Sequence, residues 1–224
     1  MIAHICQIMK QYKYLLFDLD GTITDSETGI TRCVEYALNH FGIQVNDLRE
    51  LSPFIGPPLL DSFKDFYNFT DEQAAIAVAK YRERYADKGI LENKLYPGIK
   101  ELLADAQKGG RTVILATSKP EIFAKRILDH FELKNYFSFV AGSGLDGSLH
   151  TKTDVINYIL QSNKITDLES VVMIGDRKHD IIGAKNTGID SIGVLYGFGD
   201  YKELSEAGAD HIVEDIPALR KLLL

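Results

Sequence analysis

The stretch that most constrains this chain is residues 14–22, with the sequence YLLFDLDGT. Its apolar first half has no polar face, which predicts a buried, central strand. Asp18 then lies at the carboxyl end of that strand, which is the edge of an open α/β sheet where ligands bind. Residues two apart on an extended chain point the same way, so we expect Asp18 and Asp20 to face one site. Gly21 allows a sharp turn directly after them.

The Asp18–Asp20 pair has two interpretations. Two carboxylates held close together resist ionising unless one keeps a proton or a cation lies between them, which indicates a chemical role. The plain interpretation is a strand end whose aspartates begin a turn, because Asp is a common turn residue. For an isolated Asp-x-Asp motif the turn is favoured. A catalytic interpretation requires matching residues later in the chain.

Length, composition and charge limit the class of protein that this chain can be. A chain of 224 residues has room for one large domain or for one domain with a smaller insert. Its 45% hydrophobic and 25% charged residues are typical of a soluble protein. The formal net charge of -7 argues against a nucleic-acid partner, because phosphate backbones bind concentrated basic surfaces. An anionic substrate would therefore be attracted by a local site.

Cysteine usage and hydropathy favour a cytoplasmic protein without a membrane segment. Cys6 and Cys33 do not make a disulfide framework in a chain of this length, and reduced thiols are typical of the cytoplasm. Residues 1–10 lack the charged start and continuous apolar core of a signal peptide, although their isoleucines are spaced for a short helical turn. No later run approaches the roughly 18 apolar residues of a membrane span. The sequence gives no indication of an oligomeric state.

Residues 28–91 show helical patterns without strands. Their apolar spacing predicts a helix from about Gly29, a second helix after Pro57-Pro58, and a third over residues 74–85 that is capped by Thr70 or Asp71. An insert of this length can hold a small core, and its place after the first strand predicts a cap over the ligand edge of the sheet.

Gly56 lies in the loop 54–59 of this insert, which leads into a helix N-terminus. Such a loop suits a pocket wall or a contact with an anion. A plain helix start is an equally good interpretation, because proline is common at the first helical position.

From residue 92 onward, strands and helices alternate. Besides the first strand, we expect strands at residues 112–116, 136–142, 171–174, 192–194 and 211–213. This alternation predicts an α/β fold with a doubly wound, mostly parallel sheet. The predicted organisation is a Rossmann-like core of residues 1–27 and 92–224, with an inserted all-helical cap domain of residues 28–91.

Polar residues recur at the carboxyl ends of these strands. Thr117 and Ser118 end the second strand before a helix N-terminus, which is typical of a phosphate site but also of a simple helix cap. Lys152 opens a helix, where a cation opposes the helix dipole, and taken alone it is expected to be solvated. Asp176 ends the fourth strand, and Asp180 follows in the first turn of the next helix. The matching residues that the first motif required are therefore present.

The order of these motifs resembles that of the haloacid dehalogenase-like hydrolases, a superfamily of aspartate-nucleophile phosphatases. The similarity covers residues 14–224 and rests on DLDGT at residues 18–22, on Thr117, on Lys152, and on GDRKHD at residues 175–180. The helical insert after the first motif resembles the phosphoglycolate phosphatase and β-phosphoglucomutase branch. The loop IGPP at residues 55–58 and the residues 175–180 are also similar to bacterial relatives predicted to be 5′-nucleotidases.

The resemblance implies a magnesium-dependent phosphatase that hydrolyses a small phosphomonoester through an aspartyl-phosphate intermediate. Asp18 would be the nucleophile, and Asp20 would be the general acid and base. The Asp18 carboxylate, the Asp20 carbonyl and Asp176 would bind Mg²⁺. Asp180 would either bind the metal or orient Lys152.

The resemblance also assigns the phosphate contacts. Thr117 and Lys152 would hold the phosphoryl oxygens. From their places at the strand end and in the cap loop, we also expect Ser118 and Gly56 to bind the substrate. A carboxylate that attacks a phosphate dianion needs a hard cation and a lysine to neutralise the charge. His150 and His179 match no metal-ligand spacing, so we expect them on the surface.

Several alternatives stay open from the sequence. A haloalkanoic acid dehalogenase shares the nucleophile but protonates no alkoxide, so Asp20 argues against it. A sugar phosphomutase, or a non-enzymatic phospho-receiver, would not release phosphate with turnover. The substrate is expected to be phosphoglycolate, with nucleoside monophosphates as the alternative. Selectivity is expected from residues 55–59 of the cap, and from Arg32, Tyr36 or Arg49.

Overall fold

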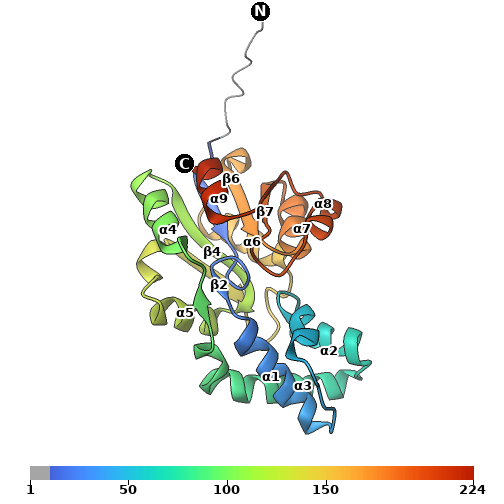
Figure 1. The fold of residues 1–224 in the computed structure, drawn as a ribbon. Coiled ribbons are helices and arrows are strands. Elements are labelled where there is room, and N and C mark those ends of the chain that lie inside the picture. Colours follow the sequence, from blue (N-terminus) through green and yellow to red (C-terminus); the bar gives the residue numbers. More distant parts are fainter. Residues whose placement is uncertain (1–10) are drawn as a thin grey trace, which may run out of the picture.

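A computed structural model of the chain describes residues 11–224, so the short helical turn expected within residues 1–10 lies outside the described residues. Six parallel strands form the central sheet in the order β5-β4-β1-β6-β7-β8 (Figure 1). The strands are β1 Tyr14–Phe17, β4 Thr112–Pro120, β5 Phe139–Ser143, β6 Val171–Gly175, β7 Asp190–Val194 and β8 His211–Val213. The first strand is central, as predicted, and strand order reverses on its two sides, which is where ligands bind in open α/β sheets.

Side chains of β1 alternate between two separate cores. Leu15 and Phe17 pack on the face that α4, α5 and α9 cover, and Leu16 packs on the face under α6 and α7. All three side chains are fully buried, which explains why the sequence shows no polar face here. The covering helices are α4 Ile99–Lys108, α5 Glu121–His130, α6 Lys152–Ser162, α7 Lys178–Thr187 and α9 Ile216–Leu223. The predicted doubly wound α/β fold is confirmed.

Helices α1–α3 lie beyond the carboxyl ends of the strands (Figure 1). They are α1 Glu27–His40, α2 Leu59–Tyr67 and α3 Asp71–Asp87. The short 3-10 helix η1 Leu48–Phe54 lies between α1 and α2, and η2 Gly89–Leu91 follows α3. Two further 3-10 helices, η3 Lys134–Tyr136 and η4 Leu168–Ser170, lie later in the chain. The two-residue strands β2 Thr24–Asp25 and β3 Lys94–Leu95 pair antiparallel where the chain enters and leaves this helical part. Thr70 caps α3 through a capping box with Gln73, as one of the two expected caps. The domain limits 28 and 91 stay a prediction, and we call α1–α3 with their loops the cap.

Several elements differ from the expectation. Strand β4 continues to Pro120, because after a register shift Pro120 still pairs with Ser143 of β5. The expected strand start near Tyr136 is wrong, since η3 occupies this position. Helix α8, Tyr201–Ala207, was not predicted because Leu204 is its one buried residue, so its apolar pattern is weak.

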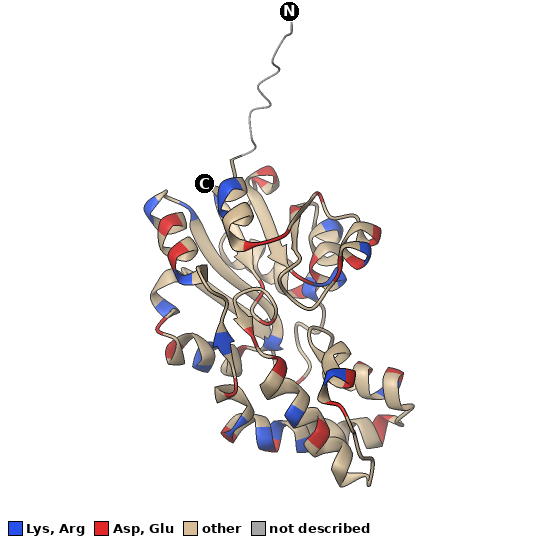
Figure 2. Cartoon of the chain, viewed as in Figure 1, with Lys and Arg blue, Asp and Glu red and all other residues tan. Residues whose placement is uncertain are grey.

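Charged side chains of both signs are interspersed over the core helices and the cap (Figure 2). This mixture agrees with a moderate net charge and leaves the attraction of an anion to a local site. Within residues 11–224, no helix is both long enough and apolar enough to cross a membrane.

Candidate active site

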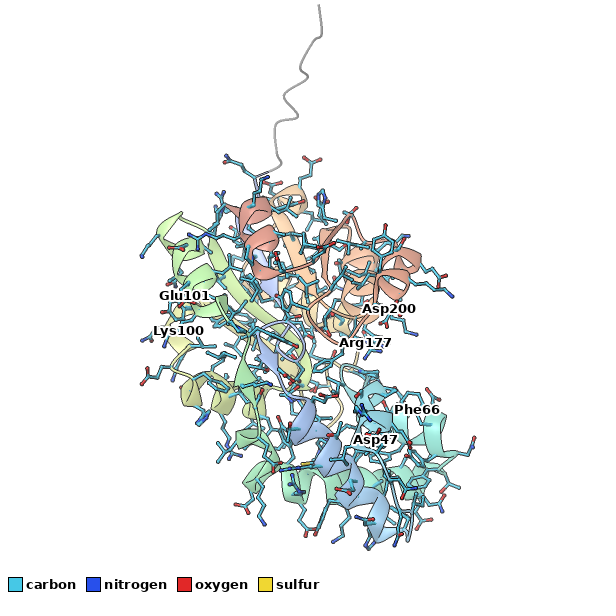
Figure 3. The ribbon with its side chains drawn as sticks, in the orientation of Figure 1. Asp47, Phe66, Lys100, Glu101, Arg177 and Asp200 are labelled. Carbon is cyan, nitrogen blue, oxygen red and sulfur yellow. The ribbon has the colours of Figure 1, made fainter. Side chains whose placement is uncertain are left out.

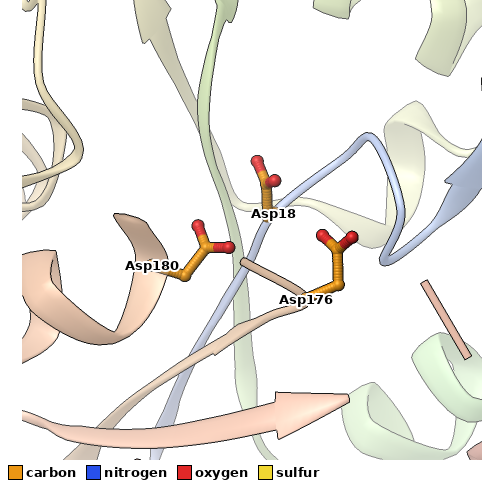
Figure 4. A group of neighbouring side chains, drawn as sticks. All are labelled: Asp18, Asp176 and Asp180. Carbon is orange, nitrogen blue, oxygen red and sulfur yellow. The ribbon is translucent and has the colours of Figure 1, made fainter. Parts of the chain in front are cut away.

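Three buried carboxylates meet at the carboxyl ends of β1 and β6 (Figure 4). Asp18 follows β1, Asp176 follows β6, and Asp180 lies in the first turn of α7. One oxygen from each carboxylate lies within 4.8 Å of the others. Because β1 and β6 are neighbouring parallel strands, their ends bring together residues that are far apart in sequence.

Two glycines allow these carboxylates to approach the backbone. Gly21 has a φ of +82°, and a Cβ there would lie 2.1 Å from an Asp176 carboxylate oxygen. A Cβ at Gly175 would lie 2.2 Å from Asp180 Cγ. A side chain at either position would displace an acidic residue, so the site requires glycine at both positions, and at Gly21 the positive φ of the turn requires it as well.

Lys152 is buried and contacts two of the three carboxylates. Its Nζ lies 2.8 Å from Asp18 Oδ1 and 2.8 Å from Asp180 Oδ1, and it donates a hydrogen bond of 2.9 Å to the Ala116 carbonyl. The α6 N-terminus therefore delivers this lysine to the site, although a lysine there opposes the helix dipole. The expectation of a solvated lysine, drawn from the general rule alone, is wrong.

Burial and mutual repulsion perturb the acidic cluster. Burial raises the pKa of Asp18 to about 6, with a further increase from Asp180, while Lys152 opposes the rise. Burial, followed by the charges of Asp180 and Asp18, raises the pKa of Asp176 well above its ordinary value. Asp176 accepts hydrogen bonds from the uncharged Thr22 hydroxyl, at 3.4 Å, and the Phe198 amide, at 2.7 Å. Lys152 thus offsets only part of the negative charge of three carboxylates, and such a donor set fits a hard divalent cation.

Asp20 is held by a second buried lysine. Asp20 Oδ2 lies 2.8 Å from Lys119 Nζ, whereas Asp20 Oδ1 is buried and has no hydrogen-bond partner among residues 11–224. Lys119 also donates a 2.8 Å hydrogen bond to the Tyr85 hydroxyl of α3. Burial alone would lower the pKa of Lys119, but Asp20 and Tyr85 hold it above its ordinary value. Lys119 is a site residue that the sequence analysis does not predict. Its position directly after Thr117-Ser118, at the carboxyl end of a strand, is the signal that could have indicated it.

A cavity of about 390 Å³ opens over Asp18 and Asp20, between the core and the cap. Its core side includes Thr117, Ser118 and Lys119. The Thr117 hydroxyl is buried and accepts a 3.2 Å hydrogen bond from the Lys119 amide. The cap contributes a mostly apolar wall, which includes Phe54, Gly56, Leu59, Tyr81 and Arg82.

The structure does not bring every predicted residue to this cavity. Lys152 lines a second hollow of about 400 Å³, which it shares with Ser118, His150 and His179. His150 is exposed, as expected, and lies 3.2 Å from Asp61 of α2. His179 is partly buried, contrary to expectation, and burial lowers its pKa.

The three additional cap residues do not line the cavity as the structure describes it. Arg32 pairs with Glu92 at 2.9 Å, Tyr36 donates to Glu83 at 2.8 Å, and Arg49 pairs with its neighbour Asp47 at 2.7 Å. The expectation that they contact the substrate is therefore wrong. Residues 56–59 do line the cavity, as expected, and Ile55 is buried beside them.

Comparisons with known proteins agree with this geometry. The haloacid dehalogenase-like hydrolase family matches residues 15–194. A 5′-nucleotidase from Pseudomonas aeruginosa is 45% identical over 213 residues, which are 95% of this chain and 96% of that protein. The crystal structure of a predicted phosphatase from Clostridium acetobutylicum has a TM-score of 0.92 at 51% identity, covering 94% of this chain and 97% of that one.

Other relatives carry different names. Tyrosine-protein kinase PtkA from Mycobacterium tuberculosis is 40% identical over 185 residues, which are 83% of this chain but 62% of that protein. Phosphoglycolate phosphatase from Vibrio cholerae is 27% identical over 224 residues, covering 96% of this chain and 99% of that protein. The family, together with the phosphatases among these relatives, supports a phosphomonoester hydrolase. The chain belongs to the haloacid dehalogenase-like hydrolases.

Proposed function

We propose that the protein is a magnesium-dependent phosphatase in which Asp18 is the nucleophile. The observation that carries this proposal is the position of Asp18 in the lining of the cavity, 2.8 Å from the buried Lys152 amine. The lysine can neutralise the charge of an incoming phosphoryl group, which the Asp18 carboxylate alone would repel. Asp20 lies two residues further on and lines the same cavity.

The metal assignment rests on the donor set of the acidic cluster. Asp18, Asp176 and the Asp20 carbonyl would hold Mg²⁺, and when bound this cation neutralises charge on the phosphoryl oxygens and the nucleophile. Asp180 accepts a 3.1 Å hydrogen bond from the Arg177 amide and lies 2.8 Å from Lys152, so we assign it to the positioning of Lys152. Its carboxylate also faces the cluster.

The side chains of the protein carry out the steps of phosphoryl transfer and hydrolysis. Asp18 attacks phosphorus and forms an aspartyl phosphate while the bond to the leaving oxygen breaks. In its protonated form Asp20 gives its proton to that oxygen, and the resulting carboxylate, held by Lys119, then takes a proton from the water that attacks the aspartyl phosphate. Thr117, Ser118 and Lys152 hold the phosphoryl oxygens, and Gly56 lies on the opposite, cap side of the cavity. Phosphate leaves and the Asp18 carboxylate is restored.

The cavity favours nucleoside monophosphates over phosphoglycolate. A volume of about 390 Å³ is far larger than a phosphoglycolate molecule needs and is in the range of sites for drug-sized ligands. Phe54 and Tyr81 of the cap, with Phe123 of α5 in the core, give the cavity apolar and aromatic surfaces that suit a planar base. The relative named 5′-nucleotidase is also more similar in sequence than the relative named phosphoglycolate phosphatase. The proposal also includes a soluble, cytoplasmic protein whose partner is a small phosphorylated metabolite.

A phosphate-release assay tests the function and the substrate together. We expect magnesium-dependent release from nucleoside monophosphates, with a higher kcat/KM than from phosphoglycolate, hexose phosphates or phosphotyrosine. Preference for phosphoglycolate would overturn the substrate assignment but keep the phosphatase. Transfer of phosphate from ATP to protein tyrosine, without release from any monoester, would overturn the phosphatase itself.

A further inference from the structure

Arg177 connects the acidic cluster to the cap. It follows Asp176, and its backbone amide donates the 3.1 Å hydrogen bond to Asp180 that closes the turn before α7. Its side chain extends out of this turn toward the cap, and Figure 3 shows it at the boundary between the core and the cap. Arg177 does not line the cavity as the structure describes it. The contacts of its side chain therefore lie outside the cavity lining.

The guanidinium group of Arg177 is held by two contacts, one to the cap and one to α8. Its Nη1 donates a hydrogen bond to the carbonyl of Ile55 in the cap, and its Nε lies 2.9 Å from Glu203 Oε1 of α8. Glu203 in turn accepts a 2.8 Å hydrogen bond from the Lys178 amide, which orients the carboxylate. The side chains of Arg177 and Glu203 are only 13% and 21% exposed, so solvent screens the pair weakly. Charge-assisted hydrogen bonds in such a setting are stronger than neutral ones.

The cap loop accepts this side chain at close range. Residues 55–58 lie between η1 and α2, outside regular helix, so the Ile55 carbonyl depends on a partner from elsewhere. Gly56 has a φ of +104°, and a Cβ there would lie 2.9 Å from Arg177 Cγ. Gly56, Pro57 and Pro58 then line the cavity. Arg177 thus contacts this loop at Ile55, away from the cavity, while the next residues of the loop form part of the cavity wall.

Other hydrogen bonds between cap and core act on different parts of the cap. Asp61 of α2 contacts His150, but both side chains are nearly half exposed, at 46% and 48%. Tyr85 and Ala86 of α3 accept from Lys119 and Arg126, both at 2.8 Å. These contacts hold α2 and α3, whereas Arg177 contacts the loop 55–58.

We propose that Arg177, supported by Glu203, is the positioning residue that fixes the loop 55–58 as a wall of the cavity and so sets selectivity for the leaving group of the substrate. The proposal rests on the proposed phosphatase function. It assigns to the arginine of the GDRKHD motif a role on the cap side of the site, separate from the acidic residues on either side of it.

The first test compares two substrates in the Arg177→Met and Glu203→Ala variants. For a nucleoside monophosphate, which reaches the loop, we expect R177M to raise KM about 10-fold, the loss expected for one charge-assisted hydrogen bond. For p-nitrophenyl phosphate, whose leaving group is smaller than a nucleoside and makes fewer contacts with the cap, KM should change less than about threefold. E203A should act in the same direction with a smaller effect, and R177K should restore part of the loss because lysine can replace one of the two contacts.

Two controls separate this role from others. The double variant R177M/E203A should resemble R177M, because the two residues act through one contact. The magnesium concentration for half-maximal activity should match the wild type, since R177M keeps the backbone amide that holds Asp180. Equal KM changes for both substrates, or a shifted magnesium requirement, would overturn the proposal in favour of a role at the acidic cluster.

Hydrogen exchange gives a readout that needs no substrate. In R177M, amides in the peptide covering residues 54–60 should exchange about 10-fold faster, while the N-terminal turn of α7 keeps its protection. Unchanged exchange in the loop would contradict the proposal even if catalysis were impaired. Absence of phosphate release from the wild type would overturn the proposed function alone, because the exchange result is independent of it.

Discussion

The two walls of the cavity are built on different principles. On the core side, the side chains of Asp18, Asp20 and Lys119 carry charges and are almost inaccessible to solvent. Asp18 lies 2.8 Å from Lys152, which stands behind this wall, and Asp20 lies 2.8 Å from Lys119. On the cap side, the wall is mostly apolar and aromatic, and its loop at residues 55–58 is held by the hydrogen bond from Arg177. The core side resembles a rigid charged site, and the cap side resembles an adjustable surface.

This difference indicates a division of labour. Buried charge pairs in fixed positions are suited to the phosphoryl group, which is the same in every phosphomonoester. An apolar wall held by few polar contacts can change its leaving-group preference without disturbing the charged site. Variants on the core side should therefore affect all substrates alike, whereas cap variants should discriminate between them.

The strongest test of the core side is Asp18→Asn. The amide is nearly isosteric with the carboxylate but is a poor nucleophile, so turnover should fall at least about 10³-fold on every substrate. Circular dichroism and the elution volume in gel filtration should match those of the wild type. Wild-type turnover in a purified, folded D18N sample would remove Asp18 from the role of nucleophile.

Lys152→Met should be the most destabilising of these variants. It leaves Asp18 and Asp180 buried without their cation, which typically costs about 3 kcal/mol of unfolding free energy, and turnover should be lost on all substrates. Denaturant unfolding measures the first effect. Lys125→Met is the matched control, because Lys125 is exposed and its ion pair within residues 11–224 is with Glu121, one helical turn away. Equal stability of the two variants would show that the acidic cluster does not depend on Lys152.

Magnesium should stabilise the protein more as pH rises. The pKa of Asp18 is raised to about 6 in the folded state, so the metal-free fold binds more protons than the unfolded chain between about pH 4 and pH 6. Metal-free stability from this group therefore falls as pH rises through that window, and ionised carboxylates become available to a cation. The gain in Tm from magnesium over chelator should be small at about pH 5 and several degrees at about pH 7.5. A gain independent of pH would place magnesium binding elsewhere.

Tyr81→Leu tests the cap side and should have the smallest effect. Leucine keeps an apolar side chain at this position but removes the aromatic face, so KM for a nucleoside monophosphate should rise about 2- to 10-fold. p-Nitrophenyl phosphate should be affected less. Tyr36→Leu, on α1 and outside the cavity, is the control and should change neither KM. An equal loss of kcat on both substrates in Y81L would contradict the division of roles between the core wall and the cap wall.

The core side was largely predictable from sequence, because parallel strands bring their carboxyl ends to one edge. Asp18, Asp176 and Asp180 each follow a recognisable strand, and that register alone predicts their proximity. Gly21 could be read as a turn residue, but its contact with Asp176 depends on a segment far along the chain.

The cap side was less predictable because helical periodicity does not show which surface meets the cavity. Arg32 and Tyr36 were expected to contact the substrate, yet the buried face of their helix, with Cys33, Val34 and Ala37, packs within the cap. The bonds of Lys119 to Tyr85, and of Arg177 to Ile55, join segments without any local pattern. Such contacts follow from tertiary packing, so they can be identified only once the three-dimensional structure is known.

The most direct test of the central claim is a rapid-mixing experiment with the Asp20→Asn variant and p-nitrophenyl phosphate. This leaving group needs little proton donation, whereas hydrolysis of the aspartyl phosphate needs the base that the variant lacks. We predict a burst of about one nitrophenol per protein, with a phosphoryl group mapped by mass spectrometry to Asp18. Nitrophenol release without a burst, or a phosphoryl group on another residue, would contradict Asp18 as the nucleophile.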